Sequence, residues 1–249
     1  MAKGILFILC LFISAESLAD GPTSRAVISI IIDDIGYRSE EGREMINLPG
    51  DLTYAVLPNA PKTKQLANLA HQQGKEVMLH MPMQSMLGEA LEQGVLDVDM
   101  EEKVVVKALK DAFDNVPHAI GMNNHQGSLL TRHPGHMTWV MKALHKGGYF
   151  FVDSRTSSQS VAETIAHEQH VAVVRRDVFL DHDIAQESIK FEFNRLIQIA
   201  KKKGHAVGIG HPHAATLAVL KEMLPQLEAL GVELVPISHQ INAVSKRSQ

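Results

Sequence analysis

The sequence is almost free of cysteine. Among its 249 residues only Cys10 is a cysteine, and it lies within the first twenty positions. The rest of the chain therefore cannot be stabilised by disulfide bonds or hold a metal through thiolates. Any metal bound by the folded chain must have nitrogen and oxygen ligands.

Runs of like charge are also scarce. The formal net charge is -4 and the isoelectric point is near 6.4, which leaves no basic surface of the kind that binds nucleic acid. The short run Lys201, Lys202 and Lys203 is typical of the solvated end of a helix. With 45% hydrophobic and 21% charged residues, we expect residues 20–249 to form a single domain with a sizeable core.

Apolar runs are short throughout the chain. The first begins after Lys3, covers residues 5–13 and is followed by a small residue, Ala19. This pattern is typical of a cleaved export signal, so we predict a signal peptide over residues 1–19 and a periplasmic protein with no stable membrane span. An uncleaved N-terminal anchor is the alternative. The residues FIL before Cys10 lack the small side chains of a lipoprotein signal.

Short apolar runs recur along the chain and are typical of buried strands. Between most of them lie segments with apolar residues at helical spacing, such as Leu66, Leu69 and Ala70. Glycines such as Gly74 and Gly204 precede several runs, where the C-terminal cap of a helix is expected. The predicted strands are residues 27–32, 52–57, 76–79, 119–122, 149–152, 171–174, 206–209 and 232–237.

Continuous apolar strands that alternate with helices indicate a parallel sheet covered on both faces. Seven or eight such units predict an α/β fold, a closed or nearly closed (β/α) barrel. An open doubly wound sheet is the alternative. Two connections, residues 81–100 and 177–187, are longer than ordinary strand-to-helix turns and both follow strands, so we expect them to shape a binding cleft.

Polar side chains follow the carboxyl ends of most predicted strands. In parallel β/α folds these strand ends surround one opening of the barrel, which we call the mouth. Residues far apart in the sequence can therefore meet there. The stretch VISIIIDDIGY is the first example, because two adjacent carboxylates end its apolar run. The side chains in this position are Asp33, Asp34, His80, Asn123, Asn124, His125, Asp153, Arg155, Asp181, His182, Asp183 and His211.

One aspartate and two histidines at this mouth suit zinc or a similar divalent ion and leave a coordination position for water. The adjacent pair Asp33 and Asp34 then has an explanation. One carboxylate binds the cation, and the other is tolerated beside it and accepts a proton from the water.

Each of these residues also has a purely structural interpretation. An aspartate after a strand often caps the next helix, and His80 alone would fit a hydrogen-bonded core histidine. His125 can be a turn residue, and Asp153 with Arg155 can be a surface ion pair. We interpret Asp181, His182 and Asp183 as a solvated loop rather than as a second metal site.

Together, the segments IIIDDIG, LHMPM, GMNNHQGSLLT, FFVDSRTS, RRDVFLD and AVGIGHPH resemble the divergent polysaccharide deacetylase family, a branch of the NodB-like carbohydrate esterases. The likeness runs from residue 30 to residue 213. It implies a distorted or incomplete barrel and metal-dependent removal of acetyl groups from N-acetylated sugars. By this resemblance Asp33 is the general base, Asp34, His80 and His125 bind the metal, and His211 is the general acid.

The sequence also departs from the ordinary deacetylases. Those proteins carry both metal histidines in one short motif, whereas His80 has no histidine three to five residues later. His125 must therefore come from a different strand. An asparagine pair replaces the family's arginine-and-proline segment, and VDSRTS replaces its later Asp-Trp motif.

Three hypotheses follow. The first is a zinc-dependent periplasmic hydrolase on an acetylated glycan, in which Asn124 or nearby backbone N–H groups stabilise the oxyanion and Asp153 with Arg155 orient the catalytic pair. The second is a catalytically silent carbohydrate-binding protein, which the low aromatic content of 5% and the single Trp139 disfavour. The third is a metal-dependent esterase or amidase on a non-sugar substrate. The sequence names no protein partner.

The segment GIGHPHAA offers two histidines for the general acid. After a strand over residues 206–209, Gly210 lets the chain turn, so His211 is the first side chain able to face the site. His213 lies beyond Pro212, where a helix is expected to begin. We therefore assign the acid to His211 and expect His213 to start the helix or meet solvent.

Overall fold

The computed structural model describes residues 25–87 and 94–246. The predicted signal peptide, residues 1–19, lies outside these ranges, as do residues 88–93 of the first long connection. No helix in the described part of the chain has the length and apolar character needed to cross a membrane.

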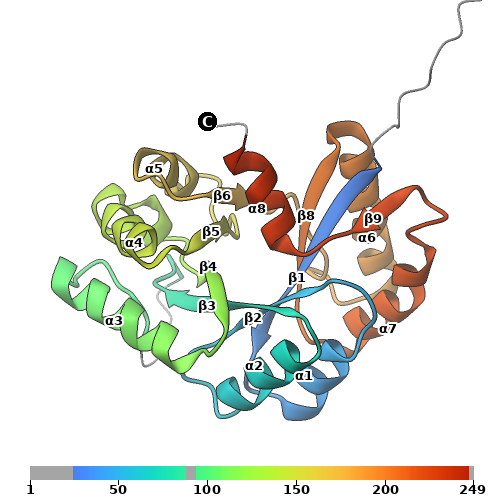
Figure 1. The fold of residues 1–249 in the computed structure, drawn as a ribbon, viewed down its shortest axis with the longest axis horizontal. Coiled ribbons are helices and arrows are strands. Elements are labelled where there is room, and N and C mark those ends of the chain that lie inside the picture. Colours follow the sequence, from blue (N-terminus) through green and yellow to red (C-terminus); the bar gives the residue numbers. More distant parts are fainter. Residues whose placement is uncertain (1–24, 88–93, 247–249) are drawn as a thin grey trace, which may run out of the picture.

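The fold is a curled parallel sheet with helices on its outer side (Figure 1). The strand order is β6-β5-β4-β3-β2-β1-β8-β7, with β9 paired to the beginning of β1, and all the pairings are parallel. The strands are β1 (Ala26–Ile35), β2 (Thr53–Val56), β3 (Glu76–Met83), β4 (Ala119–Gln126), β5 (Phe150–Asp153), β6 (Val173–Arg175), β7 (Val178–Phe179), β8 (His205–Gly210) and β9 (Val232–Leu234).

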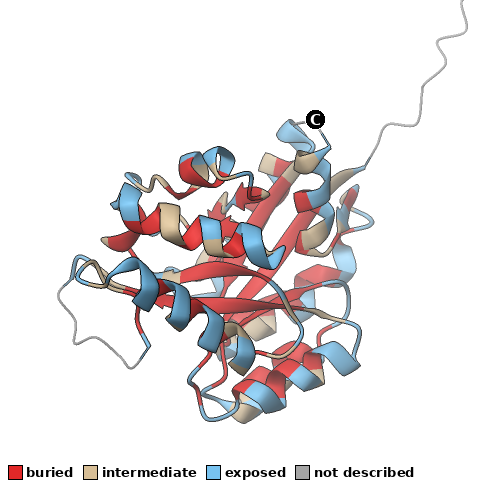
Figure 2. Cartoon of the chain, turned by 60° about the vertical axis from the view of Figure 1, so that its left-hand side comes forward, coloured by how far each residue is buried: buried red, intermediate tan, exposed pale blue. Residues whose placement is uncertain are grey.

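Seven of the helices join one strand to the next or cover the sheet from outside, with their exposed sides facing solvent (Figure 2). They are α1 (Ser39–Ile46), α2 (Thr63–Gln72), α3 (Glu102–Asn115), α4 (Pro134–Gly147), α5 (Ala162–Glu168), α6 (Gln186–Lys203) and α7 (Ala214–Met223), with short 3-10 turns at Leu130–Arg132 and Leu224–Gln226. The expected incomplete β/α barrel with a parallel sheet is therefore confirmed.

The last helix, α8 (Ile237–Ser245), lies on the inner side of the curled sheet instead. Its Ile237 and Ile241 pack against inward-facing strand residues such as Ile31 and Met78, so the interior of the barrel is a small apolar core of its own. The side chain of Gln240 donates to Ser29 Oγ at 2.9 Å and to a carbonyl of β8. These contacts fix α8 across the end of the barrel where the strands begin (Figure 1).

Two details of the predicted strands differ from the structure. The stretch 232–237 is a strand only as far as Leu234, because Pro236 ends it and Ile237 begins α8. The long connection 177–187 contains the two-residue strand β7 before α6 begins. Strand β7 is too short to produce a recognisable apolar run.

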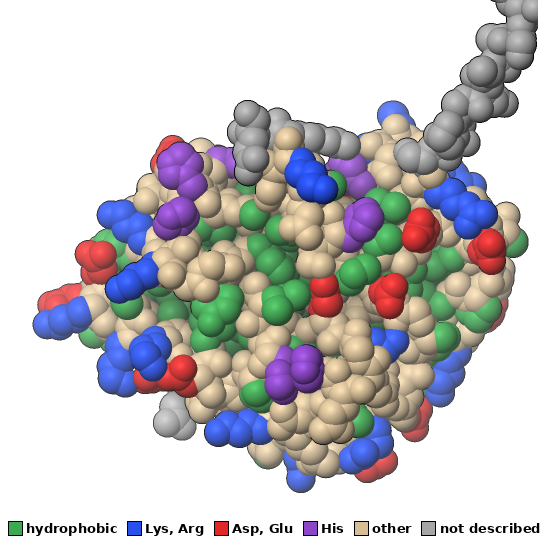
Figure 3. Space-filling model, viewed as in Figure 1, with side chains coloured by type: hydrophobic (Ala, Val, Ile, Leu, Met, Phe, Trp, Pro, Cys, Tyr) green, Lys and Arg blue, Asp and Glu red, His purple; other side chains and the backbone are tan. Residues whose placement is uncertain are grey.

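Basic and acidic side chains of the described residues are mixed around the rim of the face seen in Figure 3. Some of them form ion pairs, such as Arg25 with Glu228 at 3.6 Å. This distribution agrees with the small net charge of the chain.

Candidate active site

Asp33 and Asp34 both reach the mouth of the barrel because the end of β1 is irregular. Along β1 the side chains alternate: Ile30 and Ile32 face the helices, whereas Ile31 faces the interior. By the same alternation, the side chain of Asp33 faces the interior. Asp34 would face outward, but its backbone is left-handed, with φ of 58°, and the pairing with β2 shifts between Ile32 and Ile35.

The result is that both carboxylates approach the same imidazole. His80 Nε2 lies 3.6 Å from Asp33 Oδ2 and 3.2 Å from Asp34 Oδ1. Asp33 is 3% exposed and His80 is 1% exposed, so the cluster sits at the bottom of the mouth. A regular strand would have directed only one of the two carboxylates there.

Strands β3 and β4 bring the two histidines together. Their parallel register pairs His80 with Asn123 and Pro82 with His125, so His125 stands two residues further toward the mouth. His125 Nδ1 is 3.0 Å from His80 Nε2 and 3.0 Å from Asp34 Oδ1. The second histidine thus comes from the neighbouring strand.

Asp34, His80 and His125 fit a divalent metal. Their three ligand atoms lie 3.0–3.2 Å from one another, as expected for atoms that each sit about 2.1 Å from one shared ion. Asp34 Oδ1 is buried, and among the described residues it has no hydrogen-bond partner of good geometry. A buried carboxylate oxygen that faces two ring nitrogens is a donor set suited to a cation.

The electrostatics of the cluster also favour positive charge. Burial opposes ionisation of Asp34, but the imidazoles of His125 and His80 outweigh it and hold the pKa of this carboxyl far below its usual range. Burial likewise opposes a charged His80, yet Asp33 and Asp34 raise the pKa of its ring. Burial raises the pKa of Asp33. Positive charge beside the two carboxylates therefore stabilises the cluster.

Asn123 joins the histidine to the remaining carboxylate. Its Nδ2 donates to Asp33 Oδ1 at 2.8 Å, and its Oδ1 lies 2.7 Å from His80 Nδ1. Since the amide oxygen faces the ring, Nδ1 of His80 is the donor and Nε2 is directed at the cluster. A single buried amide therefore orients both His80 and Asp33.

His211 stands on the other side of the mouth and is held by Asp181. Its Nδ1 is 2.9 Å from Asp181 Oδ1, and its backbone N–H donates to Asp181 Oδ2 at 2.6 Å. Thr216 donates to the same Oδ2 at 2.7 Å. Burial opposes the charged form of His211, but Asp181 and the carboxylates Asp33 and Asp34 outweigh it and raise its pKa to about 9. These contacts favour the protonated form of the ring.

The interpretation of residues 181–183 as a solvated loop is wrong for Asp181. This residue is 3% exposed, and His211 and Thr216 lower its pKa although burial opposes them. His182 and Asp183 are exposed, as expected. Asp181 binds a residue thirty positions later, so no local pattern identified its partner, although the match of RRDVFLD to the family contained it.

Three of the residues named from the sequence hold loops at the mouth. Asn124 Oδ1 accepts from the N–H of Ser154 at 3.0 Å, and its Nδ2 donates to the carbonyl of Gln126 at 2.7 Å. Asp153 is fully buried and accepts from the N–H of Arg155 at 2.8 Å. The Arg155 guanidinium lies 4.0 Å from the same carboxylate, so this pair is not a surface ion pair.

Arg176 was given no role from the sequence, yet it ties two of these loops together. Its Nε donates to the carbonyl of Ser154 at 2.6 Å, and its guanidinium lies 5.1 Å from the centre of the Phe179 ring. Asn123 was grouped with the mouth residues but was also given no role. Both are recognisable only once the strand register is known.

Asp34 and His125 of this candidate metal site and His211 border one hollow of about 280 Å³. Asp34 and His125 form one side of it, His211 and His213 another, and Tyr37 stands at its rim. His213 precedes the first residue of α7, as expected, and its ring lies 5.9 Å from that of His211. A small group in this hollow would lie beside Asp34, His125 and His211 together.

Comparison with known proteins agrees with this arrangement. A model of the divergent polysaccharide deacetylase family matches residues 30–241. The uncharacterised protein YibQ of Escherichia coli K12 is 36% identical over 221 residues, which cover 89% of this chain and 69% of that protein.

Solved structures show the same fold. The uncharacterised protein ATU2773 from Agrobacterium tumefaciens C58 matches with a TM-score of 0.84 at 21% identity, covering 88% of this chain and 91% of that one. The catalytic domain of peptidoglycan N-acetylglucosamine deacetylase from Eubacterium rectale ATCC 33656 matches with a TM-score of 0.55 at 12% identity. The match covers 86% of this chain and 89% of that one.

A family 4 carbohydrate esterase (CE4) pseudoenzyme, BA3943 from Bacillus anthracis, also matches, with a TM-score of 0.50 at 12% identity, covering 87% of this chain and 66% of that one. A deacetylase and a pseudoenzyme thus share this architecture. The fold alone therefore does not decide whether a chain is catalytic, and activity must be argued from the side chains.

Proposed function

This chain belongs to the divergent polysaccharide deacetylase family, and from that premise we propose that it is a metal-dependent hydrolase that removes acetyl groups from an N-acetylated polysaccharide or cell-envelope glycan. The observation that carries the proposal is the pairing, across one hollow, of a buried carboxylate–histidine cluster with the imidazolium of His211.

Asp34, His80 and His125 hold the metal in this proposal, and their oxygen and nitrogen ligands suit zinc. The ion supplies Lewis acidity, which polarises the acetyl carbonyl and lowers the pKa of a water molecule. Asp33 is the second carboxylate beside His80, and Asn123 restrains it by donating to its Oδ1.

The proton transfers are assigned to this chain's own residues. Asp33 accepts a proton as water attacks the acetyl carbon, and His211 donates a proton to the amine nitrogen as the carbon–nitrogen bond breaks. The products are acetate and a free amino sugar. Asp181 is a positioning residue, because it holds the His211 ring and keeps it protonated.

The loop at the mouth, rather than the reacting atoms, is contacted by Asn124, Asp153 and Arg155. The amide of Asn124 is engaged with the loop that follows β5, and Asp153 is engaged with the N–H of Arg155 and the hydroxyl of Ser160. We therefore propose that they fix the shape of the hollow and that the Asn124 side chain does not contact the oxyanion.

We also propose that the protein acts in the periplasm. The support is the N-terminal pattern of a lysine, an apolar run and a small residue at position 19. The mature chain should begin near Asp20 when recovered from the periplasmic fraction. An intact Met1 in the cytoplasmic fraction would contradict this location.

The decisive experiment is to measure acetate released from a panel of N-acetylated glycans and esters, together with the metal content of the protein. One equivalent of metal and acetate release that a chelator abolishes would support the proposal. Metal and glycan binding without acetate release would favour a silent carbohydrate-binding protein, which a pseudoenzyme among the fold neighbours makes a real alternative. Acetate released only from non-sugar substrates would favour a general esterase or amidase.

A further inference from the structure

Asp181, His211 and His213 form a second group of side chains of the kinds that bind metals. Asp181 lies in the segment that leads into α6, and the two histidines lie between β8 and α7. The fold places one potential ligand atom from each of the three within 4.8 Å of the other two. The proposed reaction uses Asp181 and His211 but gives His213 no role. The group therefore has a capacity that the reaction does not explain.

A tight turn brings the two histidines side by side. The backbone N–H of His213 donates to the carbonyl of His211 at 2.8 Å, which closes a three-residue turn around Pro212. Proline suits the centre of such a turn because its ring fixes φ at about −65°. The centres of the two imidazole rings are 5.9 Å apart, and both residues line the hollow of about 280 Å³. Both are therefore accessible to an ion that enters this hollow.

Asp181 adds an oxygen ligand to this pair. Its Oδ1 lies 2.9 Å from His211 Nδ1, a separation that suits two atoms that each sit about 2.1 Å from one shared ion. Its Oδ2 already accepts from the backbone N–H of His211 at 2.6 Å and from Thr216 at 2.7 Å. An ion that replaces the ring proton of His211 would leave both carboxylate oxygens with a partner, so Asp181 would lose no contact.

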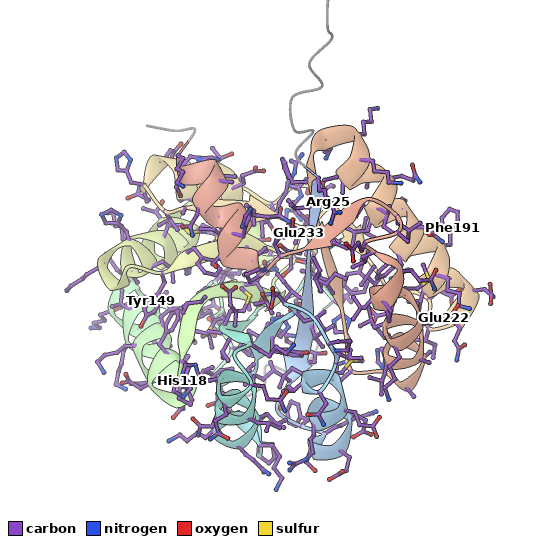
Figure 4. The ribbon with its side chains drawn as sticks, turned by 45° about the vertical axis from the view of Figure 1, so that its right-hand side comes forward. Arg25, His118, Tyr149, Phe191, Glu222 and Glu233 are labelled. Atoms are coloured by element: carbon purple, nitrogen blue, oxygen red, sulfur yellow. The ribbon has the colours of Figure 1, made fainter. Side chains whose placement is uncertain are left out.

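Helices α6 and α7 fix the position of the carboxylate relative to the turn. Thr216, in the first turn of α7, is hydrogen-bonded to Asp181, which is 3% exposed. Figure 4 shows α7 beside α6, and Glu222 of α7 forms an ion pair with Lys190 of α6 at 2.9 Å. The buried carboxylate is therefore held in place without an ion, which lowers the cost of ordering the site when an ion binds.

The charges around this group also favour a cation. Burial opposes a charged His211, yet Asp181 and Asp33 raise the pKa of its ring. The group should still bind metal more weakly than the cluster around His80. An ion must displace the proton between Asp181 and His211, and His213 is not buried, so ordering its side chain costs entropy. We therefore expect it to fill only when metal is in excess.

We propose that Asp181, His211 and His213 form a second, weaker site for a divalent ion such as zinc, and that an ion bound there inhibits turnover. As the ion binds, the proton on His211 Nδ1 leaves to solvent and this nitrogen becomes a ligand. The ring is then a neutral, metal-bound imidazole, and its Nε2 proton is far less acidic than that of an imidazolium. The inhibition rests on the proposed function, whereas the binding of the ion does not.

The test starts from protein that holds one equivalent of zinc and adds more zinc, with binding measured by calorimetry. The wild type should bind a second equivalent, more weakly than the first. His213→Ala should keep the first equivalent and bind the second at least about tenfold more weakly, because even groups outside the ligand set contribute about 10–100-fold to metal affinity. His213→Asn should behave in the same way while keeping a residue suited to the position before a helix. His182→Ala, a change at an exposed histidine next to Asp181, is the matched control and should bind both equivalents.

Acetate release is measured in the same samples. In the wild type it should fall as the second equivalent binds, whereas His213→Ala should be far less sensitive to added zinc. Absence of a second equivalent in the wild type, or a second equivalent that His213→Ala retains at full affinity, would overturn the site. Undiminished acetate release with the site filled would overturn the inhibition. A second equivalent that requires His213, in a protein that releases no acetate at any zinc concentration, would support the site and contradict the proposed deacetylase.

Discussion

Nδ1 of His80 lies 2.7 Å from Oδ1 of Asn123, and the same amide donates to Asp33. This arrangement sets the proton of His80 on the ring nitrogen that faces away from the metal cluster, which leaves Nε2 available as a ligand. It also restrains the carboxylate that we assign as the base. One buried side chain therefore positions both His80 and Asp33.

Replacing Asn123 with alanine should weaken metal binding by about 10–100-fold and lower kcat/KM, because His80 loses the group that fixes its ring. Titration with Zn²⁺ in calorimetry measures the first effect. The adjacent Asn124→Ala is the matched control, since this amide faces the loop after β5 and not the cluster. If both variants bind metal equally well, Asn123 does not orient His80.

Substitutions of Asp33 and Asp34 should have different effects on turnover and on metal binding. Asp34→Asn removes a charged ligand and should reduce the metal content well below one equivalent. Asp33→Asn should retain the metal, because Asp33 Oδ2 is further from His80 Nε2 than Asp34 Oδ1 is, 3.6 Å against 3.2 Å. It should still lose most of its turnover, by at least about 100-fold. Undiminished activity in Asp33→Asn would remove Asp33 as the base.

The barrel and the location of its mouth follow from simple sequence patterns. Apolar runs alternating with helical segments predict a parallel sheet, and the polar residues after each run predict which end carries the site. These rules alone predict that Asp33, Asp34, His80, His125 and His211 lie at the same end of the barrel. The fold was accessible because each of the longer strands has a buried apolar sequence of its own.

The residues that orient the site were not accessible in the same way. Asn123 is recognised as a bridge only through the register that pairs it with His80, and Asp181 only through its contact with His211. The left-handed backbone at Asp34 is also invisible in the sequence, because aspartate adopts this conformation without requiring glycine. Such features depend on tertiary contacts, which local sequence patterns do not reveal.

The packing of α8 against the inner side of the sheet leads to a separate prediction about stability. Ile241→Ala removes a side chain that is 4% exposed between α8 and the strands, and should lower the free energy of unfolding by about 2–5 kcal/mol. Urea denaturation followed by circular dichroism measures the change. Val106→Ala should cost less than about 0.5 kcal/mol, because Val106 is 40% exposed. A loss below about 1 kcal/mol in Ile241→Ala would mean that α8 contributes little to the core.

His211 should be the general acid, and its neighbour His213 should not. His211→Ala is expected to lose most of the turnover and the alkaline limb of the kcat/KM profile while metal content stays near one equivalent. His213→Ala should keep both, since His213 is the residue that precedes α7 and Asp181 is hydrogen-bonded to the ring of His211. Loss of metal in His211→Ala would make it a ligand instead, and a larger kinetic defect in His213→Ala would reverse the assignment.

Asp181 should control the pH at which His211 loses its proton. The pKa of His211 is raised from 6.5 to about 9, so protonation of this ring stabilises the folded state. This contribution to the free energy of unfolding is fully present below pH 6.5. It is lost as the pH rises through about 9. Asp181→Asn removes the hydrogen-bonded carboxylate, so the pKa should fall and the window of lost stability should move to lower pH. NMR titration of the His211 ring in the metal-free protein measures the pKa independently of activity, with His213 as the reference in the same spectra. An unchanged His211 pKa in Asp181→Asn would show that Asp33 and Asp34, rather than Asp181, keep this ring charged.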